Sequence, residues 1–290
     1  MSTQRRFPRR TTSTSNWQVV QASVERRILE SSWSRNLMMA RHPYLEHEGP
    51  IAFAHRGGTS TAPENSLRSF ENAVSLGYQY VETDVHASSD GVLLAFHDTN
   101  LKRTCGQDVT IQSTPYSVLS QARVEGTDPI PLLEDILGSW PQLRVNIDCK
   151  ADSALQPLID AVKRTNSLDR ICIGSFSDDR LSKIRAAFGA AVCTSMGPRE
   201  VTRFVLAASL HLPLSAPREA LAAQIPVKQG PIPVVTPSSI ALAKKWGLQV
   251  HVWTIDDPIE MSRLLDMGVD GIMTDDTETL RRVFTERHIW

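Results

Sequence analysis

Hydrophobic residues fall into two kinds of segment along most of the chain. Short apolar runs of about five residues, typical of buried strands, alternate with longer segments whose apolar residues recur every three or four positions, as in amphipathic helices. The short runs predict eight strands, at Ile51–Ala54, Tyr80–Asp84, Arg144–Asp148, Ile171–Gly174, Ala191–Thr194, Leu221–Ile225, Gln249–Trp253 and Gly271–Thr274. The longer segments predict helices at Ser66–Leu76, Ala154–Thr165, Asp178–Phe188, Ser238–Trp246 and Pro258–Met267.

This alternation predicts an α/β fold with a parallel sheet, and eight strand–helix units favour a closed (β/α)8 TIM barrel over residues 49–290. Glycines follow four of the predicted helices, where a left-handed residue commonly ends a helix. They are Gly77, Gly189, Gly247 and Gly268. The apolar stretch Phe204–Leu214 predicts a further, buried helix.

One apolar run departs from the alternation. Val92–Phe96 follows the strand at Tyr80–Asp84 too closely for a helical crossover, and Asp90-Gly91 is typical of a two-residue hairpin turn. We therefore expect a short inserted β-hairpin. Counting outward from that turn places Asp84 opposite His97, which would bring a carboxylate and a histidine together.

The N-terminal part, residues 1–48, predicts an extension to the barrel. Residues 1–16 are basic and polar, which indicates a disordered tail, and Trp17 to Ala40 has the spacing of an amphipathic helix. That helix would pack on the barrel or on another subunit, so a homodimer is possible. The N-terminus lacks the apolar core of a secretory signal, and no apolar run reaches the roughly 18–20 residues of a membrane span. We expect a cytoplasmic protein without stable membrane insertion.

Charge and cysteine content narrow the classes of partner. The chain has 31 basic and 32 acidic side chains, a net charge of −1, which gives no electrostatic footprint for nucleic acid. The four cysteines lie far apart without metal-ligand spacing. Three of them lie in apolar, strand-like runs, which indicates buried free thiols in a reducing compartment.

Chemically active residues follow the first three predicted strands, at the edge where barrel enzymes carry their active sites. Glu82 and Asp84 share a face because they are two residues apart on a strand, and Asp148 ends the next strand. Three converging carboxylates need a cation, and oxygen ligands favour Mg²⁺ or Ca²⁺.

The remaining residues at this edge suit a phosphodiester. His55 and His97 are candidates for proton transfer, and Arg56 and Lys150 for phosphate binding.

Four further features have two interpretations. Glu64 and Asn65 either bind substrate or cap the following helix, and Trp253 either lines the pocket or belongs to the core. Asp275-Asp276 is consistent with a helix cap. His86 is expected to be exposed near the hairpin turn.

These motifs, in this order, resemble the glycerophosphodiester phosphodiesterases. The resemblance covers Ile51 to Phe284 and rests on HRGG, PENS, ETDV, HD, NIDCK, GSFS and VWTIDD…LLDMGVDGIMTD. It implies a β/α barrel with a divalent-metal site that hydrolyses a glycerophosphodiester to glycerol phosphate and an alcohol. It also implies that His55 and His97 are the acid–base pair and that Arg56 and Lys150 bind the phosphate. The metal ligands that it implies are Glu82, Asp84 and Asp148. The family usually has Glu where this chain has Asp148.

Three alternatives stay open at this point. The first is a related barrel phosphodiesterase that acts on lysophospholipids, the second a non-catalytic barrel that binds phosphometabolites, and the third a metal-dependent sugar isomerase on the same fold. Within the preferred reaction, the glycerol 2-hydroxyl or a water molecule could be the nucleophile.

Overall fold

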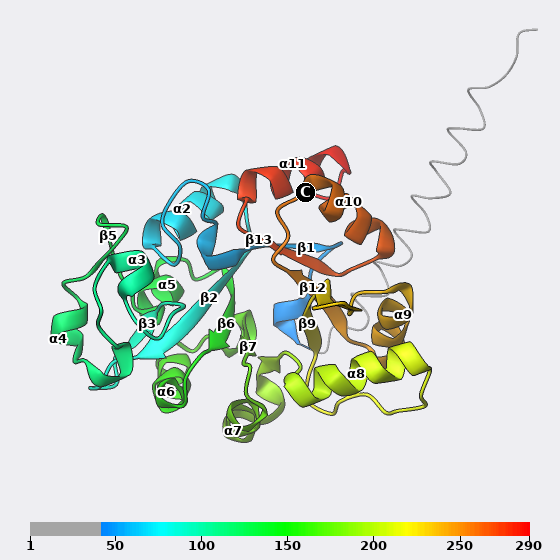
Figure 1. The fold of residues 1–290 in the computed structure, drawn as a ribbon, viewed down its shortest axis with the longest axis horizontal. Helices are drawn as coiled ribbons and strands as arrows, with labels where there is room; N and C mark the ends of the chain where they lie inside the picture. The colour runs from blue at the N-terminus through cyan, green and yellow to red at the C-terminus, as the bar shows by residue number, and fades with distance from the viewer. Residues whose placement is uncertain (1–41) are drawn as a thin grey trace, which may run out of the picture. The chain divides into compact units, whose positions relative to one another are not determined.

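Eight parallel strands surround one axis in the computed structural model, which describes residues 42–290 (Figure 1). The predicted tail and the amphipathic helix lie outside the described residues. The strands are β1 (Ile51–Ala54), β2 (Tyr80–Ala87), β6 (Arg144–Cys149), β7 (Ile171–Gly174), β8 (Cys193–Thr194), β9 (Ala222–Pro226), β12 (Gln249–Trp253) and β13 (Gly271–Thr274). Their order is β8-β7-β6-β2-β1-β13-β12-β9, and a parallel bridge between Ser195 and Ala222 joins the two ends. The predicted TIM barrel is confirmed.

Helices follow the strands and cover the outside of the barrel. They are α2 (Leu67–Leu76), α5 (Leu133–Ser139), α6 (Leu155–Thr165), α7 (Asp178–Phe188), α8 (Pro198–Leu210), α9 (Pro237–Trp246), α10 (Pro258–Met267) and α11 (Thr277–Glu286). Single 3-10 turns lie at η1 (Pro43–Leu45), η2 (His55–Gly57), η4 (Asp152–Ala154), η5 (Leu168–Arg170) and η6 (Gly189–Ala191). Gly77, Gly247 and Gly268 end their helices in the left-handed conformation, as predicted. Gly189 has a positive φ of 59° but a ψ of −139°, outside that region.

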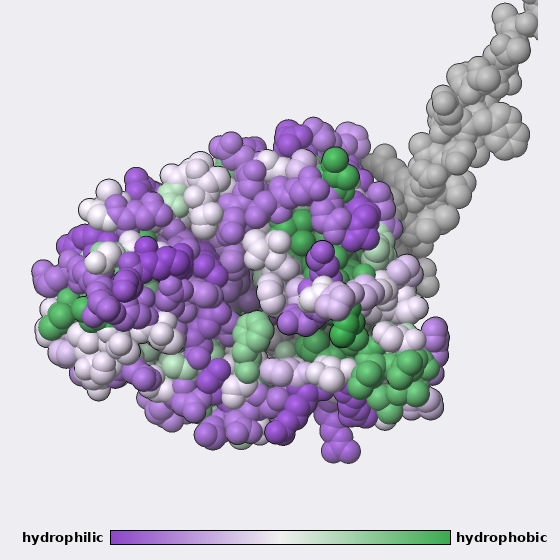
Figure 2. Space-filling model, in the orientation of Figure 1, coloured by the Kyte–Doolittle hydropathy of each residue, from purple (hydrophilic) through white to green (hydrophobic). Residues whose placement is uncertain are grey.

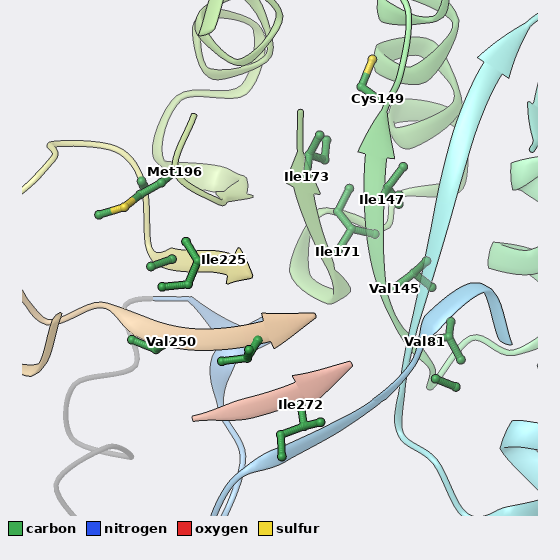
Figure 3. Packing of buried hydrophobic residues seen from close by; sticks show 14 of the residues in the cluster. Val81, Val145, Ile147, Cys149, Ile171, Ile173, Met196, Ile225, Val250 and Ile272 are labelled. Atoms are coloured by element: carbon green, nitrogen blue, oxygen red, sulfur yellow. The ribbon is translucent and has the colours of Figure 1, made fainter. Parts of the chain in front are cut away.

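Alternate residues of the strands face the helices and the barrel interior. The outward residues form the main hydrophobic core (Figure 3). Val81, Val145 and Ile147 are among them, so the neighbouring Glu82 and Asp148 point inward.

The N-terminal end of the barrel interior is filled by a separate apolar cluster that includes Phe53, Tyr80, and Tyr44 and Leu45 of η1. The Tyr80 hydroxyl donates to the Tyr44 carbonyl at 2.8 Å, which fixes this plug in place.

A small insert follows β2. It contains β3 (Leu93–Ala95), α3 (Lys102–Cys105), η3 (Ile111–Ser113), α4 (Tyr116–Leu119), and a second hairpin of β4 (Arg123–Val124) and β5 (Asp128–Pro129). The insert has its own apolar cluster, with Leu94, Leu101 and Ile111 at its centre. It therefore forms a packed unit beside the rim.

The inserted hairpin is confirmed, but its predicted register is wrong by one residue. Val85 pairs with Ala95, and the Ser88 amide donates to the Val92 carbonyl at 2.9 Å. The loop therefore has three residues, and Gly91 takes the positive φ (82°) that such a loop requires. The Ser88 hydroxyl also accepts from the Val92 amide, which stabilises the longer loop.

Because of this shift, Phe96 is the residue that bonds across to Asp84, through its amide at 2.9 Å. His97 follows one residue beyond that pair.

The prediction that Phe204–Leu214 is a buried helix is only partly right. The helix, α8, ends at Leu210; Phe204 is buried, whereas Leu206 and Leu210 are 49% and 62% exposed. A short hairpin of β10 (Lys228–Gln229) and β11 (Ile232–Pro233) lies after β9. Among residues 42–290, no helix has the combined length and apolar character of a membrane crossing.

Candidate active site

One cavity of about 810 Å³ at the carboxyl end of the barrel brings most of the predicted site residues together. Those that line it are His55, Arg56, Glu82, Asp84, His97, Asp148, Lys150 and Trp253. Glu64 and Asn65 do not line it, although both contact residues that do. The roles assigned to these side chains stay predictions, whereas their convergence is a feature of the structure.

His55 and Arg56 lie in the turn η2 that follows β1. Arg56 has a left-handed φ of 52°, and its amide donates to Glu82 Oε2 at 3.2 Å. Gly57 must be glycine, because a Cβ there would lie 2.3 Å from Ser69 Oγ. This tight packing fixes the turn, and with it the direction of the two side chains before it.

His55 is held by a carboxylate on each of its ring nitrogens. Nδ1 lies 2.7 Å from Asp275 Oδ1, and Nε2 lies 3.7 Å from Glu82 Oε2. Burial alone would lower the pKa of His55, but the two carboxylates outweigh it and raise that pKa. The imidazole is therefore suited to hold a proton near neutral pH.

Glu82 and Asp84 point into the barrel interior from β2, and their pKa values are shifted in opposite directions. Burial, and then the neighbouring Asp84 charge, raise the pKa of Glu82 to about 7. Asp84 is also buried, but Lys150 and Arg56 stabilise its charge and lower its pKa. Arg56 Nε lies 3.2 Å from Asp84 Oδ2 without donating a hydrogen bond, so this buried N–H is available to a ligand.

Lys150 lies between two of the predicted metal ligands. Its Nζ is 2.9 Å from Asp84 Oδ1 and 2.7 Å from Asp148 Oδ2. Burial opposes its charge, but these carboxylates raise the pKa of Lys150. We predicted a phosphate as the partner of this ammonium; its partners in the structure are these two carboxylates.

The donor set fits a hard divalent cation. Asp84 and Asp148 are direct neighbours in the β2–β6 register, and Asp148 Oδ1 is buried without a hydrogen-bond partner. Glu82 adds a third inward carboxylate whose charge is destabilised without a cation. Within residues 42–290, however, no three His, Cys, Asp or Glu side chains are grouped closely enough to hold an ion. Because Lys150 Nζ contacts both Asp84 and Asp148, a cation at these oxygens would also require Lys150 to move away from them.

His97 follows β3 and has an arrangement similar to that of His55. Its Nδ1 lies 2.6 Å from Asp98 Oδ1, and Arg103 Nε donates to Asp98 Oδ2 at 2.7 Å. The Arg103 hydrogen bonds lower the pKa of Asp98 to about 2, so this carboxylate is charged. His86, which we expected to be exposed, is buried, and its Nε2 lies 3.1 Å from the His97 carbonyl.

Glu64 and Asn65 contact residues that line the cavity, and neither of them caps the helix α2. Ser66 caps α2 instead, by accepting from the Ser69 amide. Glu64 accepts from Arg56 at 3.1 Å and from Arg103 at 2.6 and 2.9 Å. Asn65 donates to Asp84 Oδ2 at 3.2 Å, so both residues orient charged groups of the cavity.

Asp275 is the contact that sequence reasoning missed. The cap of α11 is Asp276, which accepts from the Thr279 amide at 3.1 Å, and Asp275 binds His55 instead. The strand order of the barrel indicates this contact. β13 pairs with β1 so that Thr274 is level with Ala54, and the residues that follow these two are Asp275 and His55.

Comparison with known proteins identifies relatives over most of the chain. The profile of the Glycerophosphoryl diester phosphodiesterase family matches residues 55–279. Probable glycerophosphodiester phosphodiesterase 2 of Mycobacterium tuberculosis is 38% identical over 251 residues, which cover 85% of this chain and 95% of that protein. Lysophospholipase D GDPD1 of Rattus norvegicus is 26% identical over 288 residues (83% and 90% coverage). The crystal structure of a putative glycerophosphoryl diester phosphodiesterase from Silicibacter pomeroyi has the same fold, with a TM-score of 0.70, 20% identity, and coverage of 88% of this chain and 98% of that one.

Proposed function

Because the chain belongs to the glycerophosphoryl diester phosphodiesterase family, we propose that its cavity hydrolyses glycerophosphodiesters to glycerol 3-phosphate and an alcohol by acid–base catalysis between His55 and His97. The observation that carries this proposal is that both histidines line one cavity while each binds a carboxylate through Nδ1. The same cavity supplies cationic groups for a phosphate.

The carboxylates determine which ring nitrogen reacts. An ionised carboxylate only accepts hydrogen bonds, so Nδ1 of each imidazole carries the proton. Nε2 is then the nitrogen that exchanges a proton with substrate. One histidine removes a proton from the nucleophile, and the other donates a proton to the leaving oxygen.

Arg56 and Lys150 are the groups that bind the phosphate. Arg56 is anchored by Glu64 and keeps its Nε available, so it can donate to a phosphate oxygen without losing its position. Lys150 would be free to bind the phosphate if a cation were held by its two carboxylate partners, Asp84 and Asp148.

Glu82, Asp84 and Asp148 are the residues that would hold Mg²⁺ or Ca²⁺. A bound cation supplies positive charge, which reduces the cost of the negative charge that develops on the phosphoryl oxygens. The shorter Asp148, in place of the usual Glu, affects which of the two cations binds better.

The reaction breaks the P–O bond to the alcohol. The alcohol oxygen leaves with a proton from one histidine, and the oxygen of water ends on phosphorus. Direct attack by water achieves this in one step. Attack by the glycerol 2-hydroxyl achieves it in two, through a cyclic phosphate that water then opens. Both routes need the same two histidines.

The test is release of glycerol 3-phosphate from glycerophosphocholine, glycerophosphoethanolamine and glycerophosphoglycerol, with Mg²⁺, Ca²⁺ or EDTA. We expect His55→Ala and His97→Ala each to reduce turnover on the order of 10²–10⁴-fold, because each removes a proton-transfer group. His288→Asn is the matched control, since His288 is exposed after α11 and its positive φ suits asparagine. Full turnover of His97→Ala in the presence of metal would contradict the assignment.

We also propose a small-molecule partner and a reducing, cytoplasmic setting. Cys149, Cys172 and Cys193 are buried free thiols, which supports a compartment without disulfide formation. The possible homodimer depends on the N-terminal helix, outside the described residues. Lysophospholipids are the second candidate substrate, and one half of the cavity favours them.

A further inference from the structure

The cavity has two halves of different chemistry. Every charged or histidine side chain that lines it belongs to the half formed by β1, β2, the start of the insert and β6. Among the described residues lining the other half, next to α8 and β9–β11, none carries a charge. That half includes Met196, Val201, Val205, Leu206, Leu210, Ile225, Ile232 and Val234.

Helix α8 presents one apolar face to this half. Val201, Val205 and Ser209 are four residues apart, so they lie on one ridge of the helix, with Leu206 and Leu210 beside it. From Val201 to Leu210 the ridge is about 14 Å long at the rise of an α-helix. In Figure 2 hydrophobic surface gathers over the C-terminal end of α8, whereas the surface over the insert is mostly hydrophilic.

The exposed face is not a sign of a loosely packed helix. On its other side Phe204 is buried and lies 5.7 Å from the Trp246 ring. At its N-terminus Glu200 accepts two hydrogen bonds from Arg185, at 3.0 and 3.2 Å. The helix is therefore fixed, and its remaining apolar face is directed at the cavity.

The hairpin of β10 and β11 adds an exposed apolar side chain to this half of the cavity. Ile232 of β11 is 55% exposed and lines the same space. Phe176 and Trp253 mark the boundary with the charged half: their rings are 6.0 Å apart, and Lys150 Nζ lies 5.7 Å from the Phe176 ring centre. A ligand phosphate at Lys150 is thus next to the entrance of the apolar half.

We propose that this half, which we call the acyl groove (Val201, Val205, Leu206, Leu210 and Ile232), binds one long hydrocarbon chain of the substrate. The inference rests on the proposed phosphodiesterase function. The groove is continuous with the charged half of the cavity. A hydrocarbon chain in the groove can therefore belong to the same molecule as a phosphodiester bound in the charged half. Burying apolar surface is favourable, by about 0.8 kcal/mol per CH₂ group, whereas a chain-free glycerophosphodiester leaves these side chains in water.

A single chain can be attached at either end of the phosphodiester. In a 1-acyl lysophospholipid it is on the glycerol, and cleavage of the P–O bond to the headgroup yields acylglycerol phosphate and the headgroup alcohol. In a glycerophospho-N-acylethanolamine it is on the leaving alcohol, and cleavage yields glycerol phosphate and N-acylethanolamine. In both, water supplies the oxygen that ends on phosphorus and the proton that ends on the alcohol.

The first experiment measures kcat/KM of the full-length protein in the presence of Mg²⁺ or Ca²⁺. Each substrate is kept below its critical micelle concentration. Glycerophosphocholine is compared with lysophosphatidylcholines of six, eight and ten carbons, and with a glycerophospho-N-acylethanolamine of matched chain length. We expect at least about a tenfold higher kcat/KM for the ten-carbon chain, growing with chain length. The better of the two chain positions identifies the source of the chain.

The second experiment changes the groove. Leu206→Glu and Ile232→Glu place a charge beside the chain at half-exposed positions, where folding tolerates it. Each is expected to reduce the ratio of kcat/KM for the ten-carbon substrate to that for glycerophosphocholine by about tenfold or more. Ile259→Glu is the matched control, because Ile259 on α10 is 77% exposed and does not line the cavity.

The possible outcomes test the acyl groove and the proposed reaction separately. Cleavage of glycerophosphocholine without any gain from a chain would overturn the acyl groove alone. If no diester is cleaved, the proposed function fails, and the groove is judged by binding: dodecylphosphocholine should bind at least tenfold more tightly than phosphocholine, and equal affinity would overturn it. If the groove variants change the molecular mass in light scattering but not the chain-length ratio, the face is an interface between copies, which also overturns the proposal.

Discussion

Two carboxylates decide how the candidate catalytic histidines can act. Asp275 holds Nδ1 of His55, and Asp98 holds Nδ1 of His97. Each carboxylate occupies Nδ1, so Nε2 of each ring is the nitrogen that we propose to react. At the residue scale, the site therefore consists of two histidine–carboxylate pairs around a group of inward acids.

Asp275→Asn is a sharp test of this orientation. The amide binds Nδ1 with less charge and can also donate to it, which favours the wrong tautomer, so we expect kcat/KM to fall on the order of 10²-fold. Loss of the carboxylate lowers the pKa of His55, and the limb of the pH–rate profile that belongs to His55 should move to lower pH.

The neighbouring aspartate provides the control. Asp276→Asn should keep near-normal activity, because asparagine caps a helix about as well as aspartate does. Equal losses in the two variants would show that this segment matters for folding and not for the orientation of His55.

Asp275 also shows why part of the site was hidden in the sequence. Local spacing placed both histidines, both phosphate-binding candidates and all three inward carboxylates at one end of the barrel, because they lie on or directly after the strands β1, β2, β3 and β6. The His55–Asp275 contact joins residues 220 positions apart, across the β1–β13 pair that closes the barrel. Two consecutive aspartates before a helix look like a cap until that pairing is known.

At the scale of elements, periodicity predicted the barrel strands and the helices between them because amphipathic spacing is a local property. The hairpin register was wrong because the choice between a two- and a three-residue loop depends on the Ser88 hydroxyl and the backbone of Gly91. The burial of α8 was overstated because an apolar face can be directed at a ligand cavity as well as at a core. Sequence alone does not distinguish these two destinations.

The insert contributes to the site through one side chain of α3. Arg103 binds Asp98 through Nε at 2.7 Å and Glu64 through Nη2 at 2.6 Å. It therefore connects Asp98, which binds His97, with Glu64, which binds Arg56. The same contacts that hold the insert to the barrel also orient the candidate catalytic groups.

We expect Arg103→Met to lower kcat by between about tenfold and about 10²-fold, because a small displacement of His97 misaligns proton transfer. Asp98 stays ionised at neutral pH without Arg103, so the effect is one of position and not of charge. Lys102→Met is the matched control, since Lys102 is on the same turn and makes only an exposed ion pair with Asp108 at 3.8 Å. If kcat of Arg103→Met equals that of wild type, the insert does not position His97.

At the scale of the whole molecule, a chain of polar side chains runs through the interior of the barrel. Gln224 donates to Asn146 at the cavity and lies 3.5 Å from His251 Nδ1. His251 Nε2 lies 3.0 Å from Gln249 Oε1, and Gln249 donates to the Leu45 carbonyl at 3.1 Å. The cavity is thus connected to the plug at the opposite end of the barrel.

His251 makes this interior sensitive to acid. Burial lowers the pKa of His251 from its ordinary 6.5 to about 3. Between these values the unfolded chain binds a proton that the native ring does not, so the free energy of unfolding decreases as the pH falls below 6.5. From pH 7 to pH 5 this group alone should remove about 2 kcal/mol of stability.

His251→Gln keeps a donor for Gln249 but has no titrating ring. It should be less stable than wild type at pH 7, and the difference should shrink by about 2 kcal/mol at pH 5, because only wild type has this buried imidazole to protonate. Urea unfolding midpoints at the two pH values, followed by tryptophan fluorescence, measure this. The other buried histidines are common to both proteins and cancel in the difference. A difference that stays constant with pH would contradict this prediction, because it would mean that the His251 ring has the same pKa in the native barrel as in the unfolded chain.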